Sequence, residues 1–266
     1  MNRITETFAR LRQQRKHALI PFIVAGDPDL RTTVELLVEL AHAGANVIEL
    51  GIPFSDPVAD GPVIQRASMR ALENGAGVTE ALEVLAEARR QTDVPIVLFS
   101  YFNPLLKFGI EKLSVEAQRA GADGVLVTDL PAEEGGDFTA RLARKGLHTI
   151  LLVAPTTTDE RLQIIAERAS GFIYAVSRAG VTGARSEPSN DAELLVNRVR
   201  QVSNLPVAVG FGVSTAAQVA DVFRYADAAV VGSAIVAEIE KLAGAPDLAQ
   251  RLGDFTRALL PKGSEP

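Results

Sequence analysis

The sequence of 266 residues contains no cysteine. Disulfide bonds, thiolate nucleophiles and iron–sulfur clusters held by cysteine are therefore excluded, and the composition is compatible with the reducing cytoplasm, where we expect the protein to reside. Positive charge is also scarce, with 27 lysines and arginines against 33 aspartates and glutamates. Because a nucleic-acid-binding protein needs a basic face, we expect small-molecule partners and no nucleic acid.

Long apolar runs are missing as well. No run approaches the roughly 18 residues that a membrane-spanning helix needs, and no apolar segment near the start precedes a small-residue cleavage site. The histidines, His17, His42 and His148, show none of the paired spacing that is typical of a zinc site. We therefore expect no membrane association, no export and no metal site.

Short apolar runs alternate with amphipathic helical segments from Ala18 onward, which indicates βαβ units and a parallel sheet. A closed (β/α)8 TIM barrel requires eight such strands. The sequence offers Leu19–Val24, Val47–Leu50, Ile96–Ser100, Gly124–Thr128, Thr149–Val153, Phe172–Val176, Val207–Gly210 and Ala228–Val231. We expect a single α/β barrel domain over residues 1–266. An open doubly wound sheet is the alternative, although its Gly-x-Gly-x-x-Gly fingerprint is missing after the first strand.

A short amphipathic helix is expected before the first strand, because Ile4, Phe8 and Leu11 have helical spacing. No lysine falls on any of the expected strands, so a Schiff-base aldolase is disfavoured.

The segment Val47–Pro62 carries an acidic residue from a strand into a loop that holds further acids. Alternate side chains of a strand share a face, so Glu49 points the same way as Val47, into the core. Burial raises the pKa of such a carboxyl group, which suits a residue that transfers protons. Asp60 ends the loop, and three prolines stiffen it. In the alternative interpretation Glu49 pairs with a hidden cation and the loop acids are ordinary turn residues.

Barrels place their active sites at the C-terminal ends of the strands, so polar residues at the other strand ends are further candidates. Asp129 follows the fourth strand and is a rival to Glu49 that chemistry alone does not rank. Tyr174 lies on the sixth strand. The long polar segment after it, reaching Asp191, contains two glycines and indicates either a closing lid or an idle surface loop.

Glycines stand between strand and helix after the seventh and eighth strands. Gly212 and Gly232 would let an anion approach bare backbone N–H groups, and barrels commonly bind phosphate with these two loops. Alternatively, Ser214 is only a helix N-cap and Gly232 only a tight turn. Together with the carboxylates, the glycines predict acid–base chemistry on a phosphorylated substrate, without a metal or a bound organic cofactor.

Five segments resemble the family of tryptophan synthase alpha chains, and the match covers essentially the whole chain. They are Pro21–Pro28, Glu49–Pro62, Ser177–Gly183, Gly210–Gly212 and Gly232–Val236. The second and third are highly specific. The resemblance implies a (β/α)8 barrel whose floor is closed by the N-terminal helix. It also implies a lyase that cleaves indole-3-glycerol phosphate to indole and glyceraldehyde 3-phosphate by a retro-aldol reaction.

The same resemblance implies roles for individual residues. Glu49 would be the general acid/base, in preference to Asp129, and Asp60 would bind the indole N–H. The substrate would also contact Phe22, Tyr174, Gly183, Phe211, Gly212, Gly232 and Ser233. A beta chain would face Asp56, Tyr101 and Asn103. The two chains would form an α2β2 heterotetramer in which the beta chain carries pyridoxal phosphate and this chain needs no cofactor.

Two other functions stay open. A sugar-phosphate epimerase or isomerase of the same fold would share the glycines but not Asp60. A non-catalytic barrel subunit would bind the substrate and regulate a partner, although the presence of both Glu49 and Asp60 argues against it.

Overall fold

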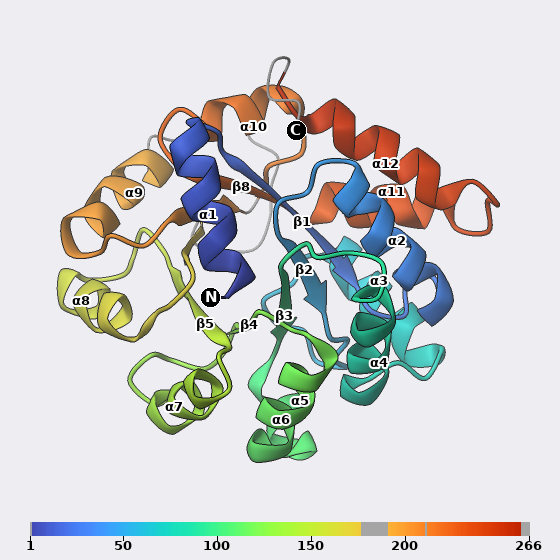
Figure 1. The fold of residues 1–266 in the computed structure, drawn as a ribbon, viewed down its shortest axis with the longest axis horizontal. Coiled ribbons are helices and arrows are strands. Elements are labelled where there is room, and N and C mark those ends of the chain that lie inside the picture. Colours follow the sequence, from blue (N-terminus) through green and yellow to red (C-terminus); the bar gives the residue numbers. More distant parts are fainter. Residues whose placement is uncertain (1, 177–190, 211, 262–266) are drawn as a thin grey trace.

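The computed structural model describes residues 2–176, 191–210 and 212–261 (Figure 1). Parallel strands pair in sequence order, and β8 pairs with β1 to close a barrel. The strands are β1 Ala18–Val24, β2 Ile48–Gly51, β3 Ile96–Ser100, β4 Gly124–Val127, β5 His148–Val153, β6 Ile173–Val176, β7 Val207–Gly210 and β8 Ala228–Val231. Each strand lies within one residue of its expected bounds. The (β/α)8 prediction is therefore confirmed, and the open-sheet alternative is wrong.

Helices surround the barrel (Figure 1). Those of the described residues are α1 Arg3–Gln14, α2 Leu30–His42, α3 Pro62–Glu73, α4 Val78–Ala88, α5 Phe102–Phe108, α6 Ile110–Ala120, α7 Gly136–Arg144, α8 Asp159–Arg168, α9 Asp191–Val202, α10 Ala216–Val222, α11 Ser233–Leu242 and α12 Leu248–Leu259. None of them combines the length and the apolar character needed to cross a membrane. That residues 1–266 form one domain stays a prediction.

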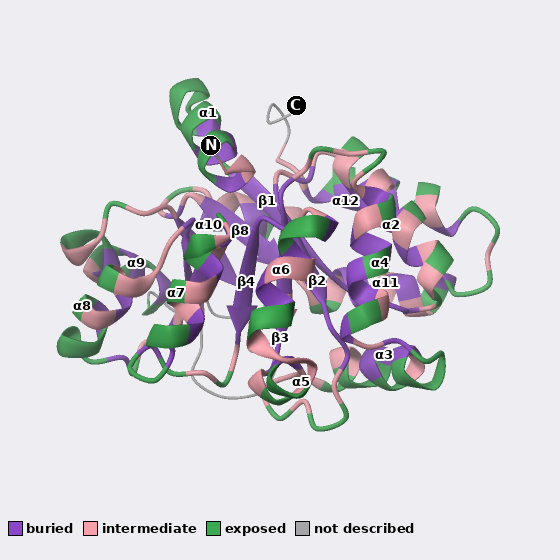
Figure 2. Cartoon of the chain, turned by 60° about the horizontal axis from the view of Figure 1, so that its bottom comes forward, coloured by how far each residue is buried: buried purple, intermediate pink, exposed green. Residues whose placement is uncertain are grey.

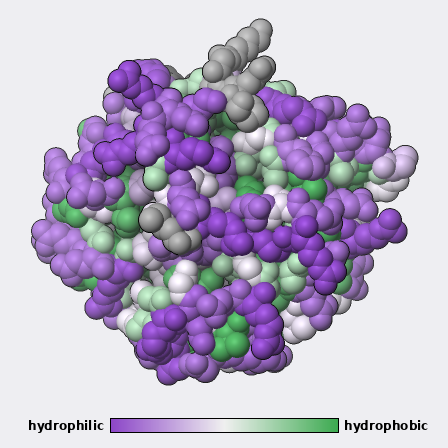
Figure 3. Space-filling view, in the orientation of Figure 1, coloured by the Kyte–Doolittle hydropathy of each residue, from purple (hydrophilic) through white to green (hydrophobic). Residues whose placement is uncertain are grey.

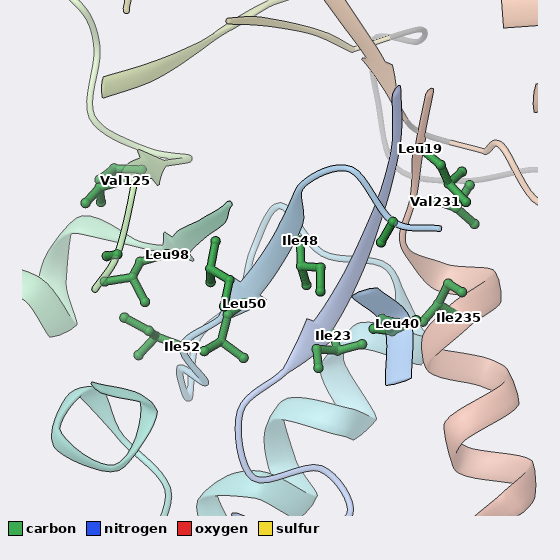
Figure 4. Close-up of a cluster of buried hydrophobic side chains, with 14 of the residues drawn as sticks. Leu19, Ile23, Leu40, Ile48, Leu50, Ile52, Leu98, Val125, Val231 and Ile235 are labelled. Carbon is green, nitrogen blue, oxygen red and sulfur yellow. The ribbon is translucent and has the colours of Figure 1, made fainter. Parts of the chain in front are cut away.

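Aliphatic side chains pack the outer face of the barrel against the helices. Figure 4 shows Ile48, Leu50 and Leu98 of the strands with Leu40 of α2 and Ile235 of α11, and all five are fully buried. Burial of each such side chain contributes about 1.5–3 kcal/mol. Because helices cover the sheet, its strands are apolar on both faces, whereas exposed residues lie on the outer sides of the helices (Figure 2).

The N-terminal end of the barrel is closed by α1, which lies across it in Figure 1. Ile4, Phe8 and Leu11 are buried in one cluster with inward-facing strand residues. The ring centroid of Phe8 lies 5.8 Å from that of Phe172. The face of the molecule that carries α1 is largely hydrophilic, as Figure 3 shows. The predicted floor helix is therefore confirmed.

The strand register gathers chemistry-bearing residues inside the opposite half of the barrel. Phe22 of β1 is the register partner of Glu49 of β2, and Glu49 is the register partner of Val97 of β3. The loop that follows β2 leads into α3, and α11 starts directly after β8. Both helices pack against β1 and against each other. These elements position the candidate site.

Candidate active site

Glu49 is buried on the inner face of β2, with 1% of its surface exposed. Its neighbour on that face is Val47, whose side chain joins the inward-facing cluster, as predicted. Within the described part of the chain, the Oε1 atom has no hydrogen-bond partner. Burial raises the pKa of Glu49 to about 8, and no described cation opposes this rise. Glu49 therefore keeps its proton at pH 7, and the alternative of a structural ion pair is not supported.

The raised pKa makes the stability of the fold depend on pH. Between the unfolded value of 4.5 and the folded value of about 8, the native state holds a proton that the unfolded chain releases. The contribution of Glu49 to stability is thus fully present below pH 4.5 and is lost as pH rises through about 8. We expect the free energy of unfolding to fall by a few kcal/mol more in wild type than in Glu49→Gln between pH 5 and pH 9. Urea unfolding of both proteins across this range tests the difference, and equal falls would contradict it.

Asp60 reaches the site from the far end of the loop after β2. The hydroxyl group of Tyr101 accepts a hydrogen bond from the N–H of Ala59 at 2.9 Å and is hydrogen-bonded to the carboxylate of Asp60. Burial raises the pKa of Asp60 to about 6, and the Tyr101 hydroxyl opposes this rise by donating to the ionised form. At pH 7 Asp60 is mostly ionised while Glu49 is mostly protonated. The site therefore offers one base and one acid.

A pocket with aromatic walls lies beside Asp60. The ring of Phe22 meets that of Phe99 edge-on, with centroids 5.2 Å apart, and the rings of Phe54 and Tyr101 are 5.4 Å apart. The lining comprises Phe22, Val24, Gly51, Ile52, Phe54, Asp60, Ile64, Ser68, Phe99, Ser100 and Tyr101. Apolar walls with one placed carboxylate suit a flat aromatic ligand that bears an N–H group.

Several lining residues are not candidates from the sequence, among them the large side chains of Phe54, Ile64 and Phe99. Phe99 had a usable signal, because it alternates along β3 with the inward-facing Val97. Phe54 stands in the loop after β2 and Ile64 in the first turn of α3. Their positions depend on how that loop folds over β3, so no local pattern identifies them.

Tyr174 is buried on β6, and the charges of Glu49 and Asp60 both act on it. Burial raises the pKa of Tyr174 well above its ordinary value, and the two carboxylates raise it further. Its hydroxyl group lies so close to Gly210 that a Cβ atom at that position would be 2.0 Å away. Glycine at the end of β7 therefore makes room for a neutral hydroxyl group near both carboxyl groups.

The N-terminus of α11 lies beside the aromatic pocket. The helix begins after Gly232, and no side chain of the described residues caps its first N–H groups. A Cβ atom at Gly232 would lie 3.7 Å from the Cβ of Phe22. Ser233 is exposed at the first helical position and adds a hydroxyl group. Uncapped N–H groups and the helix dipole together favour an anion at this end of α11.

Gly212, in the turn after β7, is exposed and has a φ of +82°, a backbone conformation that favours glycine. None of the described residues lies within 4 Å of the position that a Cβ atom would take there. The N-cap of α10 is Thr215, which forms a capping box with Gln218. Ser214 instead donates its N–H and its hydroxyl group to the side-chain oxygen of Gln218. The alternative that Ser214 caps the helix is therefore wrong by one residue.

The model of the tryptophan synthase alpha chain family matches residues 8–259. The chain belongs to this family. Curated relatives include the tryptophan synthase alpha chains of Geotalea daltonii and Citrifermentans bemidjiense, which are 47% and 48% identical over 259 residues. Each match covers 97% of this chain, with 98% of the first relative and 97% of the second.

Solved structures of the same family have the same fold. The chain is similar to tryptophan synthase subunit alpha from Legionella pneumophila, with a TM-score of 0.90 and 36% identity over 97% of both chains. It is also similar to a chain of the tryptophan synthase a2b2 complex from Pyrococcus furiosus, with a TM-score of 0.85 and 42% identity. That match covers 91% of this chain and 97% of the other.

Asp129, the alternative to Glu49 as the acid or base of this chain, is exposed. Its Oδ1 atom accepts a hydrogen bond of 2.7 Å from the N–H of Phe102, the first residue of α5. Asp129 therefore stabilises the start of a helix, and it does not line the aromatic pocket.

The residues expected to face a beta chain differ in their exposure. Asp56 and Asn103 are exposed, on the loop after β2 and on α5. Tyr101 is only 3% exposed, because it lies beneath the loop with its hydroxyl group on Asp60. In this conformation the Tyr101 side chain can act on a partner only through the loop that covers it.

Two expected substrate contacts, Gly183 and Phe211, lie outside the described residues, as does the expected lid apart from Asp191. Their roles stay predictions. The structure does bring Phe22, Glu49, Asp60 and Tyr174 together, with Gly232 adjacent.

Proposed function

We propose that this chain is the lyase subunit that cleaves indole-3-glycerol phosphate to indole and glyceraldehyde 3-phosphate. The observation that carries the proposal is the pair of carboxyl groups with opposite protonation at pH 7. Asp60 lines the aromatic pocket, and Glu49 is the register partner of Phe22 in that lining. Glu49 holds its proton because its pKa is about 8, and Asp60 is ionised because its pKa is about 6. Membership of the tryptophan synthase alpha chain family agrees with this reaction.

The protonation states assign the steps of a retro-aldol reaction. Glu49 donates its proton to C3 of the indole ring, and the positive charge that develops on the ring nitrogen is stabilised by the carboxylate of Asp60. The ionised Glu49 then removes the proton of the adjacent substrate hydroxyl group. The carbon–carbon bond breaks, its electron pair returns to the ring, and the hydroxyl carbon becomes the aldehyde. Indole leaves, and Glu49 has regained its proton.

The two ends of the substrate are held at different places. Phe22 and Phe99 pack around the ring, while the N-terminus of α11 at Gly232 and Ser233, with Gly212, binds the phosphate. Gly183 and Phe211 belong to the same proposal as further contacts. Fixing both ends places the reacting carbon beside Glu49, which lowers the entropic part of the barrier.

Release of indole from indole-3-glycerol phosphate tests the function directly. We expect indole and glyceraldehyde 3-phosphate in equal amounts. A product that is an epimer or isomer of the substrate would favour the sugar-phosphate enzyme, and binding without turnover would favour a regulatory subunit. The presence of both Asp60, in the lining of the aromatic pocket, and Glu49, the register partner of the lining residue Phe22, favours the lyase over both.

The partner belongs to the same proposal. A beta chain would receive the indole and join it to serine with its own pyridoxal phosphate, in an α2β2 heterotetramer. The similarity to a chain of the Pyrococcus furiosus a2b2 complex supports this assembly. No cofactor is required for the steps assigned to Glu49 and Asp60. A cytoplasmic location completes the proposal, in keeping with a sequence that lacks cysteine.

Asp56 is the residue through which we expect the partner to act on Asp60. Inside the loop, the N–H of Val58 donates to the carbonyl of Asp56 at 2.9 Å, and the N–H of Asp60 donates to that of Pro57 at 3.0 Å. A partner docked on Asp56 would thus restrain the segment that carries Asp60. Asp56→Ala should leave the slow cleavage by the isolated chain unchanged but reduce its stimulation by the beta chain about 5- to 150-fold.

Titration of the beta chain into wild type and Asp56→Ala, with indole release as the readout, measures this loss. Asp254→Ala on α12 is the control for removal of an exposed acid elsewhere. If Asp56→Ala responds to the beta chain as wild type does, the coupling does not pass through Asp56.

Gly212→Leu should weaken binding of the phosphate end of the substrate. A bulky side chain would fill the space over the turn after β7 and keep phosphate away from backbone N–H groups. We expect the Kd for indole-3-glycerol phosphate to rise at least about tenfold, while indole alone binds as before, since one charge-assisted contact is worth about 1.5–3 kcal/mol.

Gly244→Leu is the matched control, because Gly244 also has a positive φ, of +84°, and an open Cβ position. Gly244→Leu therefore measures the effect of placing leucine at a position of positive φ outside the proposed phosphate site. Equal losses for indole and for the phosphorylated substrate in Gly212→Leu would show that the effect is not specific to phosphate.

A further inference from the structure

An ion-pair network joins the three elements that carry the two ends of the proposed site. Arg70 on α3 forms two hydrogen bonds with the carboxylate of Asp27, at 2.8 and 3.0 Å. Its remaining nitrogen donates to Glu240 on α11 at 2.7 Å. Arg66, one turn earlier on α3, binds both oxygens of Glu240 at 2.8 and 2.7 Å. Asp27 follows β1 and is 1% exposed.

Two members of the network, Glu240 and Arg70, have pKa values that are shifted in favour of their charged forms. Hydrogen bonding from Arg66 and from Arg70 lowers the pKa of Glu240 to about 2. The hydrogen bond to Asp27 raises the pKa of Arg70. Bidentate pairs between arginine and carboxylate fix direction as well as distance, which a lysine cannot do.

Each element in the network also carries a part of the site. Asp60 immediately precedes Gly61, the N-cap of α3. The N-terminus of α11 is the proposed phosphate site, two turns before Glu240. β1 carries Phe22, whose ring lines the aromatic pocket and whose Cβ atom lies close to Gly232 at the start of α11.

Small residues let these elements approach closely behind the pocket. Ala67 and Ala71 of α3 are fully buried in one cluster with Phe22 and with Val236 of α11. Asn74, just past the end of α3, donates to the carbonyls of Gly26 and Pro28 at 3.3 and 2.5 Å. Apolar burial holds the elements together without a preferred direction, whereas the bidentate arginine–carboxylate pairs fix direction as well as distance.

We propose that Arg70 is a positioning residue of the reaction. Because Arg70 forms ion pairs with Asp27 and Glu240 at the same time, it fixes the separation between Asp60, at the indole end, and the N-terminus of α11, at the phosphate end. A ligand that spans both ends depends on this separation. A ligand that touches only one end does not. The inference rests on the proposed function.

The test compares Arg70→Lys with wild type by calorimetry, using three ligands. They are indole, glyceraldehyde 3-phosphate, and a non-cleavable analogue in which a propyl chain joins indole to phosphate. We expect the Kd of the spanning analogue to rise about tenfold and those of the two fragments to change less than twofold. Turnover of indole-3-glycerol phosphate should fall about 10- to 100-fold, because a displacement of about 1 Å costs up to about 10²-fold in rate.

Arg257→Lys is the matched control. Arg257 bridges α12 to Glu39 of α2 at 3.2 Å and to Asp254 at 2.9 Å, away from the site. It should lose comparable stability and keep wild-type Kd values for all three ligands. If Arg70→Lys fails to fold, Glu240→Gln, which keeps the shape of the partner, takes its place with the same expected pattern.

Two results would overturn the inference: unchanged binding of the spanning analogue by the folded variant, or equal weakening of all three ligands, which is a structural effect only. Failure of the proposed function would look different, as a wild type that releases no indole.

Discussion

Glu49→Gln should reduce the rate of indole release by about two to four orders of magnitude, the range by which a general acid/base accelerates a reaction. The amide has the shape of the carboxyl group but cannot give a proton to the indole carbon and take one from the hydroxyl group. Because Glu49 is buried without an ion-pair partner among the described residues, the neutral replacement breaks no ion pair. Steady-state assays with indole-3-glycerol phosphate, at saturating substrate, measure the loss.

The substrate-binding step provides the control for this variant. Glu49→Gln should bind the non-cleavable indole-propyl-phosphate analogue within a few-fold of wild type, since Phe22, Asp60 and α11 are unchanged. A folded variant that turns over at nearly the wild-type rate would show that another group moves the protons.

Asp60→Asn should lower kcat/KM by about 10²- to 10³-fold, the usual loss when one electrostatic contact to the transition state is removed. It should also change the pH profile. In wild type, kcat/KM should rise as Asp60 ionises through about pH 6 and fall as Glu49 loses its proton through about pH 8. The variant should lack the acidic limb and keep the alkaline limb. Indole release measured from pH 5 to pH 9 resolves both limbs.

Tyr101→Phe keeps the carboxyl group of Asp60 but removes the hydroxyl group that stabilises its ionised form. The Tyr101 hydroxyl group lowers the pKa of Asp60, so its removal should move the acidic limb to higher pH and leave the alkaline limb in place. If the acidic limb persists unchanged in Asp60→Asn, the group that ionises near pH 6 is a residue other than Asp60.

The barrel and the acid at its centre were predictable from the sequence because the signals are local. Runs of apolar residues at regular intervals define strands whose two faces are both covered, and all eight lie within one residue of the structure. The inward direction of Glu49 follows from its spacing to Val47, since the side-chain period of a strand is two. Glycines such as Gly232 are visible because a strand, a glycine and a helix start follow one another directly.

The walls of the site were not predictable in this way. Phe54 and Ile64 reach the pocket only because the loop after β2 folds back over β3. Tyr101 was expected at a partner surface, yet it is buried, because the same loop covers it. A local pattern carries no information about which loops cover which side chains, since that depends on contacts between residues 40 or more positions apart, such as the bond from Ala59 to Tyr101.

The sequence by itself determined the fold class, the amphipathic N-terminal helix and the inward direction of Glu49, since each depends on periodicities within one element. Only the tertiary structure decided the protonation states of Glu49 and Asp60, because desolvation depends on everything packed around a carboxyl group. It also decided the link from Asp27 through Arg70 to Glu240, whose members are separated by 43 and 170 positions along the chain. Three elements meet there only because the barrel closes β8 onto β1, which brings α11 beside α3.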